Sequence, residues 1–277
     1  MVRFALLGAG RIGAMHAANI AANRRARLHA VYDVHRPTAA KVAAAHGATV
    51  AESVAAALAE ADAVLIASST DTHVGLIAAA AQAGKPVLCE KPIDLDIKRV
   101  EQCRRDIAGL GVPVQIGFNR RYDPSHRALR EAVRGGEIGQ LELLIITSRD
   151  PALAPMEYMR VSGGIFRDMT IHDFDFARFV LGEDPVEVYA TGSVMVEQGL
   201  EQLDDVDTAM VVMKAASGAL VHINNSRRAV YGYDQRMEAF GSRGMIQSGN
   251  RRASTVRRYG AERTAARDPL LHFFIER

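Results

Sequence analysis

Short apolar runs alternate with amphipathic, alanine-rich stretches through the first 118 residues. The runs have the length and composition of buried strands, at Arg3–Leu7, Leu28–Tyr32, Ala63–Ala67, Pro86–Cys89 and Val112–Ile116. The stretches between them predict helices at Ala14–Ala22, Thr38–Ala45, Val54–Leu58, Val74–Ala83 and Ile97–Ala108. Strands that alternate with helices are typical of a parallel sheet covered on both faces, so the pattern predicts an α/β, doubly wound Rossmann domain.

The pattern changes after Gly117-Phe118-Asn119. We expect helices at Asp123–Arg134 and at about Thr170–Leu181, separated by the apolar run Leu141–Thr147 and a loop that contains Pro151 and Pro155. Apolar runs bounded by turn residues predict strands at Val186–Val196, Val206–Lys214, Ala219–Asn225, Gln235–Phe240 and Met245–Gln247. The chain therefore divides into a dinucleotide-binding domain, residues 1–118, and an α+β domain, residues 119–277, with a mainly antiparallel open sheet.

The composition is that of an ordinary globular protein, with 48% hydrophobic and 24% charged residues. No apolar run approaches the ~20 residues of a membrane span, and the opening segment is too short for a signal peptide. We therefore expect a cytoplasmic protein that binds no membrane. The net charge is only +2, so we interpret the basic residues Arg251, Arg252, Arg257 and Arg258 as a solvated loop and expect no nucleic-acid partner.

The chain has two cysteines, Cys89 and Cys103, and they form no C-x-x-C motif. We expect both to be reduced and structural, and we expect no zinc site.

A G-x-G-x-x-G motif, Gly8-Ala9-Gly10-Arg11-Ile12-Gly13, follows the first predicted strand and opens the first predicted helix. Glycines at these positions allow a tight turn and the close approach of a pyrophosphate, whose charge sits at the helix N-terminus. The motif therefore predicts a dinucleotide site. The alternative is a glycine turn that binds no ligand.

Asp33 ends the second predicted strand, 20 residues beyond Gly13. A carboxylate at this place accepts hydrogen bonds from the adenosine ribose and repels a 2′-phosphate, which favours NAD over NADP. Asp33 as an ordinary turn residue is the alternative, and the nearby Arg36 would partly offset its repulsion of a phosphate.

Glu90-Lys91-Pro92 comes just after the strand Pro86–Cys89, at the carboxyl edge of the predicted sheet, where doubly wound folds bind ligands. Pro92 stiffens this turn and fixes the direction in which Lys91 leaves it. We expect Lys91 to reach the reactive end of the cofactor. A surface lysine without a role is the alternative.

Asp168 and His172 lie four positions apart in the segment Gly163–Asp175, and they share one face if the segment is helical. A carboxylate beside an imidazole orients it and holds its proton, as a general base for an alcohol requires. The alternative is that Asp168 caps the helix and His172 is a buried structural residue. Asp168, His172 and Asp173 do not form a set of metal ligands, because a third ligand at a plausible spacing is lacking. We therefore expect no metal.

With these motifs in order, the chain resembles the Gfo/Idh/MocA family of NAD(P)-dependent sugar and polyol oxidoreductases over essentially its whole length. The matching segments are Gly8–Gly13, Glu90–Pro92, Gly117–Asp123, Gly163–Asp175, Asp205–Ala209 and Asn224–Gln235. Within the family, the last of these segments points to the members that oxidise inositol.

The resemblance implies a catalytic trio of Lys91, Asp168 and His172. It also implies that Ser69, Thr70 and His73 lie along the cofactor with Glu90, although Ser69 and Thr70 are equally compatible with an ordinary loop. By the same reasoning, the side chains expected to line the polyol pocket are Arg120, Arg149, Asp150 and Tyr233.

The activity that the resemblance implies is NAD-dependent oxidation of myo-inositol to its 2-keto product. Two alternatives remain: a dehydrogenase for another cyclitol, an aldose or an amino-sugar relative, and an NAD-binding sensor without turnover. The family further implies a homodimer or homotetramer built through the C-terminal sheet. The chain departs from the family's pattern at Leu270–Arg277, where members usually continue into a further helix, so the sequence is truncated there or the protein has lost that helix.

Overall fold

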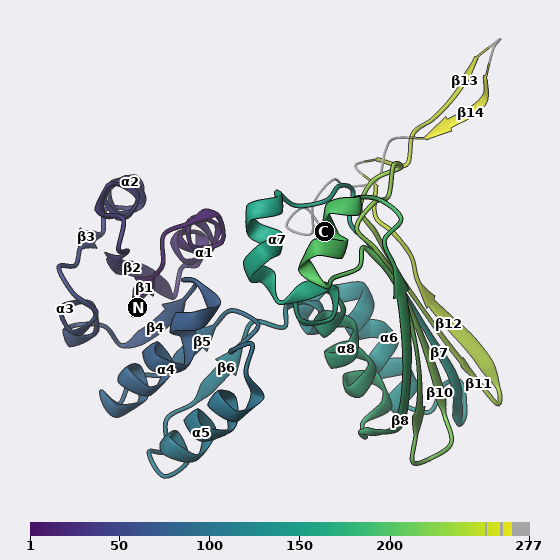
Figure 1. Cartoon of the computed structure of the whole chain (residues 1–277), viewed down its shortest axis with the longest axis horizontal. Helices are drawn as coiled ribbons and strands as arrows, with labels where there is room; N and C mark the ends of the chain where they lie inside the picture. The colour runs from purple at the N-terminus through teal and green to yellow at the C-terminus, as the bar shows by residue number, and fades with distance from the viewer. Residues whose placement is uncertain (253, 261–262, 268–277) are drawn as a thin grey trace. The chain divides into compact units, whose positions relative to one another are not determined.

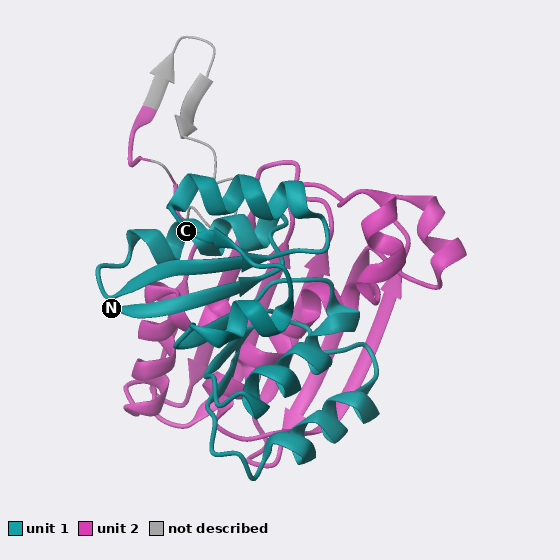
Figure 2. Ribbon diagram, turned by 90° about the vertical axis from the view of Figure 1, so that its left-hand side faces the viewer, with its two compact units in different colours: residues 1–118 teal, residues 119–277 magenta. Residues whose placement is uncertain are grey.

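The computed structural model describes residues 1–252, 254–260 and 263–267. The chain divides into two compact units, Met1–Phe118 (unit 1) and Asn119–Arg277 (unit 2), which are coloured separately in Figure 2. Each unit has its own six-stranded sheet and its own hydrophobic core.

The sheet of unit 1 is wholly parallel, with the strand order β3-β2-β1-β4-β5-β6 (Figure 1). The strands are β1 (Val2–Leu7), β2 (Ala26–Tyr32), β3 (Thr49–Val50), β4 (Ala63–Ile66), β5 (Val87–Cys89) and β6 (Val114–Ile116). The helical segments are α1 (Arg11–Ala22), α2 (Arg36–His46), α3 (Val54–Ala59), η1 (Thr70–Thr72), α4 (His73–Gln82) and α5 (Ile97–Ile107). The doubly wound Rossmann sheet that the sequence predicts is confirmed.

The central strands of unit 1 are buried on both faces, which explains their continuous apolar sequences. Leu6 belongs to a core cluster with Leu28, whereas the next residue, Leu7, belongs to a different cluster with Ile77. Successive side chains of a strand point to opposite faces, so helices have to cover both sides of this sheet. The edge strand β3 was not predicted, because two residues are too few to show an apolar pattern.

The sheet of unit 2 has the strand order β12-β11-β7-β10-β9-β8. The strands are β7 (Leu141–Arg149), β8 (Pro185–Ser193), β9 (Thr208–Ala215), β10 (Leu220–Ser226), β11 (Asp234–Gly241) and β12 (Gly244–Ser248). Only β7 and β10 run parallel within this sheet, and the four other neighbouring pairs are antiparallel. The mainly antiparallel sheet is therefore confirmed.

Two helices, α6 (Pro124–Arg134) and α8 (Ile171–Leu181), cover one face of this sheet (Figure 1). Leu129 of α6 and Phe176 of α8 are buried against strand residues such as Ile146. Burial alternates strictly along β9, so the opposite face presents residues such as Met210 to solvent. This open face is apolar at several points.

The segment between β7 and α8 differs from the prediction. We expected a proline-containing loop around Pro155, but Pro155 begins the helix α7 (Met156–Ser162) as its N-cap residue. Proline has no backbone N–H and is tolerated at the start of a helix, where that donor would have no intrahelical partner. The next segment, η3 (Phe166–Thr170), is a π-helix that runs directly into α8. Short 3-10 segments complete the unit at η2 (Asn119–Tyr122) and η4 (Gln198–Leu203).

The interpretation of the basic residues near position 255 as a loop was wrong in part. Arg257 and Arg258 belong to β13 (Arg257–Gly260), which pairs with β14 (Arg263–Arg267). The prediction rested on charge, and charge does not indicate whether a backbone pairs in a sheet. Arg251, Arg252 and Arg257 are solvent-exposed, as expected. The C-terminal segment Leu270–Arg277 lies outside the described residues.

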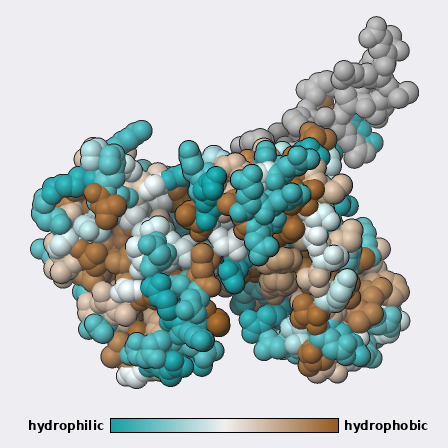
Figure 3. Space-filling model, in the orientation of Figure 1, coloured by the Kyte–Doolittle hydropathy of each residue, from teal (hydrophilic) through white to brown (hydrophobic). Residues whose placement is uncertain are grey.

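Within the described ranges, no helix is both long and apolar enough to cross a membrane. On the face drawn in Figure 3, hydrophilic and hydrophobic residues are interspersed over each unit.

Candidate active site

The glycine motif forms the turn between β1 and α1. Gly8 has a φ of +96°, and a Cβ atom built on it would lie 2.4 Å from the backbone nitrogen of Ser68. A Cβ atom on Gly13 would lie 2.0 Å from the carbonyl oxygen of Gly8. Gly10 differs, because no atom of the described chain lies within 4 Å of its Cβ position. The turn itself therefore requires Gly8 and Gly13, whereas Gly10 borders open space.

That open space lies at the N-terminus of α1. Gly10 is the N-cap residue, and no side chain caps this helix. The first N–H groups of a helix and its dipole favour an anion at this end, so a pyrophosphate fits there. A pocket of about 330 Å³ adjoins the turn and is lined by Ala9, Gly10, Arg11, Ala14, Thr38, Lys41, Val42, Ala45 and His46.

The carboxylate of Asp33, directly after β2, is held by the backbone. Oδ2 accepts a hydrogen bond from the Ala9 N–H at 2.7 Å, and Oδ1 accepts one from the His35 N–H at 2.8 Å. Arg36 points its guanidinium to Glu52, with which it forms a bidentate ion pair. Arg36 is thus engaged with another carboxylate, and Asp33 keeps its position beside the glycine turn.

His73 joins the loops that follow β4 and β5. It is 1% exposed; its Nδ1 lies 2.8 Å from the carbonyl oxygen of Pro92, and its Nε2 lies 3.1 Å from that of Ser68. Ser69 and Thr70 begin the short η1 segment before α4. Since β1, β4 and β5 are neighbours in the sheet, the glycine turn, the Ser68–Thr70 segment and the Lys91 turn meet at one carboxyl edge.

The Glu90 side chain makes several contacts around the turn that carries Lys91. Its Oε1 lies 2.7 Å from Nε2 of His16 on α1, and its Oε2 accepts a hydrogen bond from the Lys91 backbone N–H at 3.2 Å. The carboxyl group also contacts Gly117, where a Cβ atom would lie 3.1 Å from it. Glu90 therefore sets the direction of the chain at Lys91, which is half-buried at the carboxyl edge of β5.

In unit 2, Asp168 lies on the π-helical segment η3 and His172 on the first turn of α8. The expected α-helical stacking of these residues is therefore interrupted by a π-helix, a feature often found at functional sites. Asp168 Oδ1 accepts a hydrogen bond from the Tyr158 hydroxyl at 2.7 Å, and Oδ2 accepts one from Arg227 Nη1 at 3.1 Å.

Arg120 and Asp173 form a buried ion pair next to this segment. Asp173 also accepts hydrogen bonds from the Ser148 hydroxyl at 2.6 Å and from the Asn225 amide at 2.8 Å. Burial disfavours the charge of Arg120, but Asp173, Tyr233 and Asp150 together outweigh this effect and raise the pKa of the guanidinium. This network ties η2, which carries Arg120, to α8, β7 and β10.

Two further predicted residues lie near Arg120. With the Gln235 amide turned so that its oxygen faces Arg120, that oxygen accepts hydrogen bonds from the guanidinium and, at 3.0 Å, from the Tyr233 hydroxyl. Burial raises the pKa of Asp150 to about 6, while Arg227 and Arg120 oppose the rise. Asp150 is thus a carboxyl group that takes up a proton at higher pH than an ordinary aspartate.

The structure does not place Arg149 beside Arg120 and Asp173. Its Nη1 donates to the Tyr231 hydroxyl and its Nη2 to Asn224 Oδ1, both at 2.9 Å. Asn224 and Asn225 alternate along β10, and Asn225 is the one that faces Asp173. Arg149 therefore lies on the opposite face of the sheet, away from Arg120 and Asp173.

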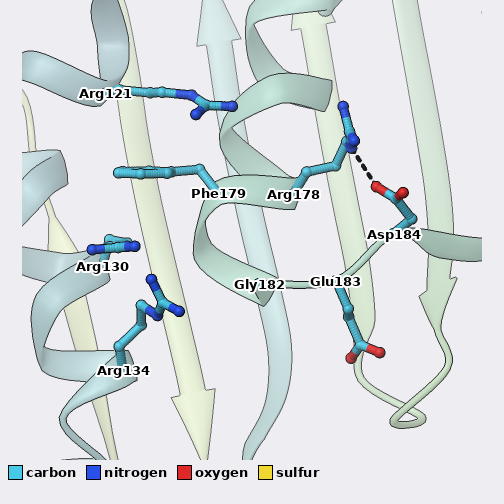
Figure 4. A pocket seen from close by; sticks show the side chains of 8 residues that line it. All are labelled: Arg121, Arg130, Arg134, Arg178, Phe179, Gly182, Glu183 and Asp184. Atoms are coloured by element: carbon cyan, nitrogen blue, oxygen red, sulfur yellow. Dashed lines mark hydrogen bonds and ion pairs between the residues drawn. The ribbon is translucent and has the colours of Figure 1, made fainter.

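A second pocket in unit 2, of about 390 Å³, contains four arginines around Phe179 (Figure 4). Arg130 and Arg121 stack on the Phe179 ring at 4.4 and 4.9 Å from its centroid, and Arg178 pairs with Asp184. None of its lining residues is among the predicted site residues. Over the part of the chain that the structure describes, no three His, Cys, Asp or Glu side chains gather where they could hold a metal ion.

Sequence reasoning missed three residues in these surroundings. His16 lies one turn beyond Gly13 on the helix that the motif opens, so its closeness to the glycine turn could have been predicted from the sequence. Arg227 lies in the segment Asn224–Gln235, but nothing in the sequence signals that it is buried. Tyr158 lies on α7, in a segment where the prolines predict a loop.

The comparisons with known proteins agree along the whole chain. Residues 2–118 match the family model described as the oxidoreductase family with an NAD-binding Rossmann fold, and residues 126–247 match the GFO/IDH/MocA C-terminal domain. The inositol 2-dehydrogenase of Rhizobium meliloti is 47% identical over 100% of this chain and 84% of its own length.

Solved structures give the same result. A myo-inositol dehydrogenase from Corynebacterium glutamicum has a TM-score of 0.95 and 49% identity, covering 100% of this chain and 84% of that chain. A scyllo-inositol dehydrogenase from Lactobacillus casei, with bound NAD(H) and scyllo-inositol, has a TM-score of 0.91 and 30% identity, covering 100% and 84%. The chain belongs to the Gfo/Idh/MocA family of NAD-binding oxidoreductases.

Proposed function

We propose that the protein oxidises myo-inositol to its 2-keto product with NAD. The observation that carries the proposal is the match, along the entire chain, to relatives named as inositol dehydrogenases at up to 49% identity. The carboxyl edge of the unit 1 sheet supports the proposal. The glycine turn and Asp33 at this edge suit NAD, and Lys91 follows β5 at the same edge.

We propose that three residues carry the chemistry. When bound, NAD supplies the hydride acceptor, and the protein supplies orientation and charge. His172 takes the proton of the reacting hydroxyl as the bond from carbon to hydrogen breaks. Lys91 donates a hydrogen bond to the same oxygen and stabilises the negative charge that develops on it. Asp168 orients His172 and balances the imidazolium that forms.

We infer that the polyol is held by Arg120, Asp150 and Tyr233. The support is that Arg120 and Tyr233 share Gln235 as a partner, and that Asp150 interacts electrostatically with Arg120. Arg120 can donate and the carboxyl group of Asp150 can accept, which suits ring hydroxyls, each of which both donates and accepts. We leave Arg149 out of this pocket, because its partners lie on the other face of the sheet.

The test is turnover with a panel of polyols: myo-inositol, scyllo-inositol, an aldose and an amino sugar, each with NAD. We expect the highest kcat/KM for myo-inositol. A clear preference for another polyol would keep the dehydrogenase and change its substrate. NAD binding without NADH formation from any of them would instead indicate a sensor.

We further propose that the protein forms a homodimer or homotetramer through the open face of the unit 2 sheet and works in the cytoplasm. Exposed apolar residues on or beside this face include Leu143, Tyr189, Met210, Val212 and Phe240, with exposed fractions of 40–68%. The buried free thiols Cys89 and Cys103 suit a reducing compartment. A monomer in light scattering would contradict the assembly, and Met210→Lys should weaken it.

A further inference from the structure

Arg227 is a buried cation with one carboxylate partner among the ion pairs of the described residues. The residue is 2% exposed and lies just after β10. Its Nη1 donates to Asp168 at 3.1 Å, whereas its Nε and Nη2 are buried and make no hydrogen bond within the described structure. Burying a guanidinium is costly unless a counter-charge compensates it. Asp168 is that counter-charge.

The backbone holds Arg227 in place from two sides. Its N–H donates to the carbonyl oxygen of Asp207 at 2.8 Å, and the Asp207 carboxylate in turn accepts three backbone N–H groups from residues 195–197. Ala229 N–H donates to the Asp150 carbonyl oxygen at 2.7 Å, beyond the last paired residue of β10. Because the backbone around Arg227 is held in this way, its side chain can fix the position of its partner, Asp168.

Asp168 is fixed on both of its oxygens. Tyr158 on α7 donates to one and Arg227 to the other, while the carboxylate itself lies on the π-helical η3, one turn from His172. A carboxylate that accepts two such hydrogen bonds is stabilised as the anion. It is thereby suited to orient an imidazole and unsuited to take its proton.

We propose that Arg227 is a positioning residue for the dehydrogenase reaction: it holds Asp168 in orientation and balances its charge, so that His172 faces a fixed and partly neutralised carboxylate. The inference rests on the proposed function. Arg227 acts through Asp168 and is assigned no contact with substrate.

The charges around Asp168 determine what removal of Arg227 should do. Tyr158 is neutral, Arg227 is the adjacent cation, and Asp150 is a further carboxyl group that interacts electrostatically with both Asp168 and Arg227. Arg120 is the next cation, and it is already paired with Asp173. Without Arg227, the negative charge near His172 is less balanced, which favours the protonated imidazole. The acidic limb of the pH profile of kcat/KM should then move to higher pH.

The experiment compares Arg227→Gln and Arg227→Lys with two controls. Arg228→Gln removes the exposed neighbouring arginine, and Tyr158→Phe removes the uncharged donor to Asp168. We expect Arg227→Gln to lower kcat by roughly 10- to 100-fold and to shift the acidic limb upward by about one pH unit. Arg227→Lys should keep the limb but lower kcat by about tenfold, because an ammonium does not reproduce the guanidinium geometry. Tyr158→Phe should shift the limb less than Arg227→Gln, and Arg228→Gln should change neither kcat nor the limb.

The NMR titration of His172 in the same variants does not depend on turnover. A wild type without inositol-dehydrogenase activity would overturn the proposed function, whereas an upward shift of the His172 titration in Arg227→Gln would still support the role of Arg227. If Arg227→Gln does not fold, Arg227→Lys decides, since normal kcat in that variant overturns the proposal. An unchanged acidic limb and an unchanged His172 titration in a folded Arg227→Gln protein would also overturn it.

Discussion

The Asp33 carboxylate accepts a hydrogen bond from the backbone N–H of Ala9 at 2.7 Å, so the end of β2 and the glycine turn are bonded to each other. The same carboxylate is the negative group expected at the adenosine ribose, and the cation nearest in sequence, Arg36, is paired with Glu52. We therefore expect both cofactor choice and turn geometry to depend on this side chain.

Replacing Asp33 should relax the choice of cofactor. Asp33→Asn keeps the shape and an acceptor for Ala9 but removes the charge that repels a 2′-phosphate. We expect the ratio of NADP to NAD dissociation constants to fall by about tenfold, which corresponds to about 1.4 kcal/mol. Titration of both cofactors measures it. Equal affinities in the unmutated protein would show that Asp33 does not face the ribose.

Two glycines of the motif offer a matched pair. An alanine at Gly13 would push its Cβ to 2.0 Å from the Gly8 carbonyl oxygen, whereas an alanine at Gly10 meets no described atom within 4 Å. Gly13→Ala should therefore lower the free energy of unfolding by about 1–3 kcal/mol. Gly10→Ala should leave stability nearly unchanged and weaken NAD binding, because its Cβ occupies the space of the pyrophosphate. Thermal unfolding and NAD titration of both variants separate the effects, and tight NAD binding by Gly10→Ala would place the pyrophosphate elsewhere.

Much of unit 1 could be predicted from sequence, because its chemistry follows local rules. The glycine turn, Asp33 and Lys91 each follow a strand whose apolar run is visible, and parallel strands bring their carboxyl ends to one edge. The contacts of His16 with Glu90 and of His73 with Pro92 join residues 74 and 19 positions apart, and no local pattern reveals them.

Unit 2 was less predictable at the site. Two prolines, Pro151 and Pro155, precede α7, and prolines so close together are typical of a loop. The sequence therefore does not reveal that Pro155 is the N-cap residue of a helix. The π-helix at Asp168 and the burial of Arg227 depend on tertiary contacts rather than periodicity. Arg149 was assigned by resemblance, but the side-chain alternation along β7 directs it to the far face.

Asp150 should make stability depend on pH. Its pKa is raised from 3.8 to about 6 by burial, so the folded state binds a proton more tightly than the unfolded chain between these values. The free energy of unfolding should therefore fall as pH rises from about 4 to about 6, by up to about 3 kcal/mol from this group. Asp150→Asn removes this contribution. Denaturant titrations at about pH 3.5 and about pH 7 bracket this interval. They should show the variant gaining stability relative to wild type at the higher pH; a constant difference would contradict the assignment.

Metal removal should leave the reaction unchanged. We expect Lys91 to supply the cation at the reacting oxygen, so no metal ion is required. Dialysis against EDTA should leave kcat as it was, with a zinc-dependent alcohol dehydrogenase as the positive control for chelation. Activity that is lost with EDTA and restored by zinc would contradict this expectation.

The most direct test of the account is the rate of NADH formation from myo-inositol by the wild-type protein and by Lys91→Arg. A guanidinium keeps the charge but is larger, planar and always protonated, so it should not replace a compact ammonium at the reacting oxygen. We expect wild type to reduce NAD and Lys91→Arg to lower kcat by roughly 100-fold or more, with NAD affinity nearly unchanged. Near-normal kcat in Lys91→Arg would contradict the catalytic role of Lys91, and the absence of NADH formation by wild type would contradict the proposed reaction.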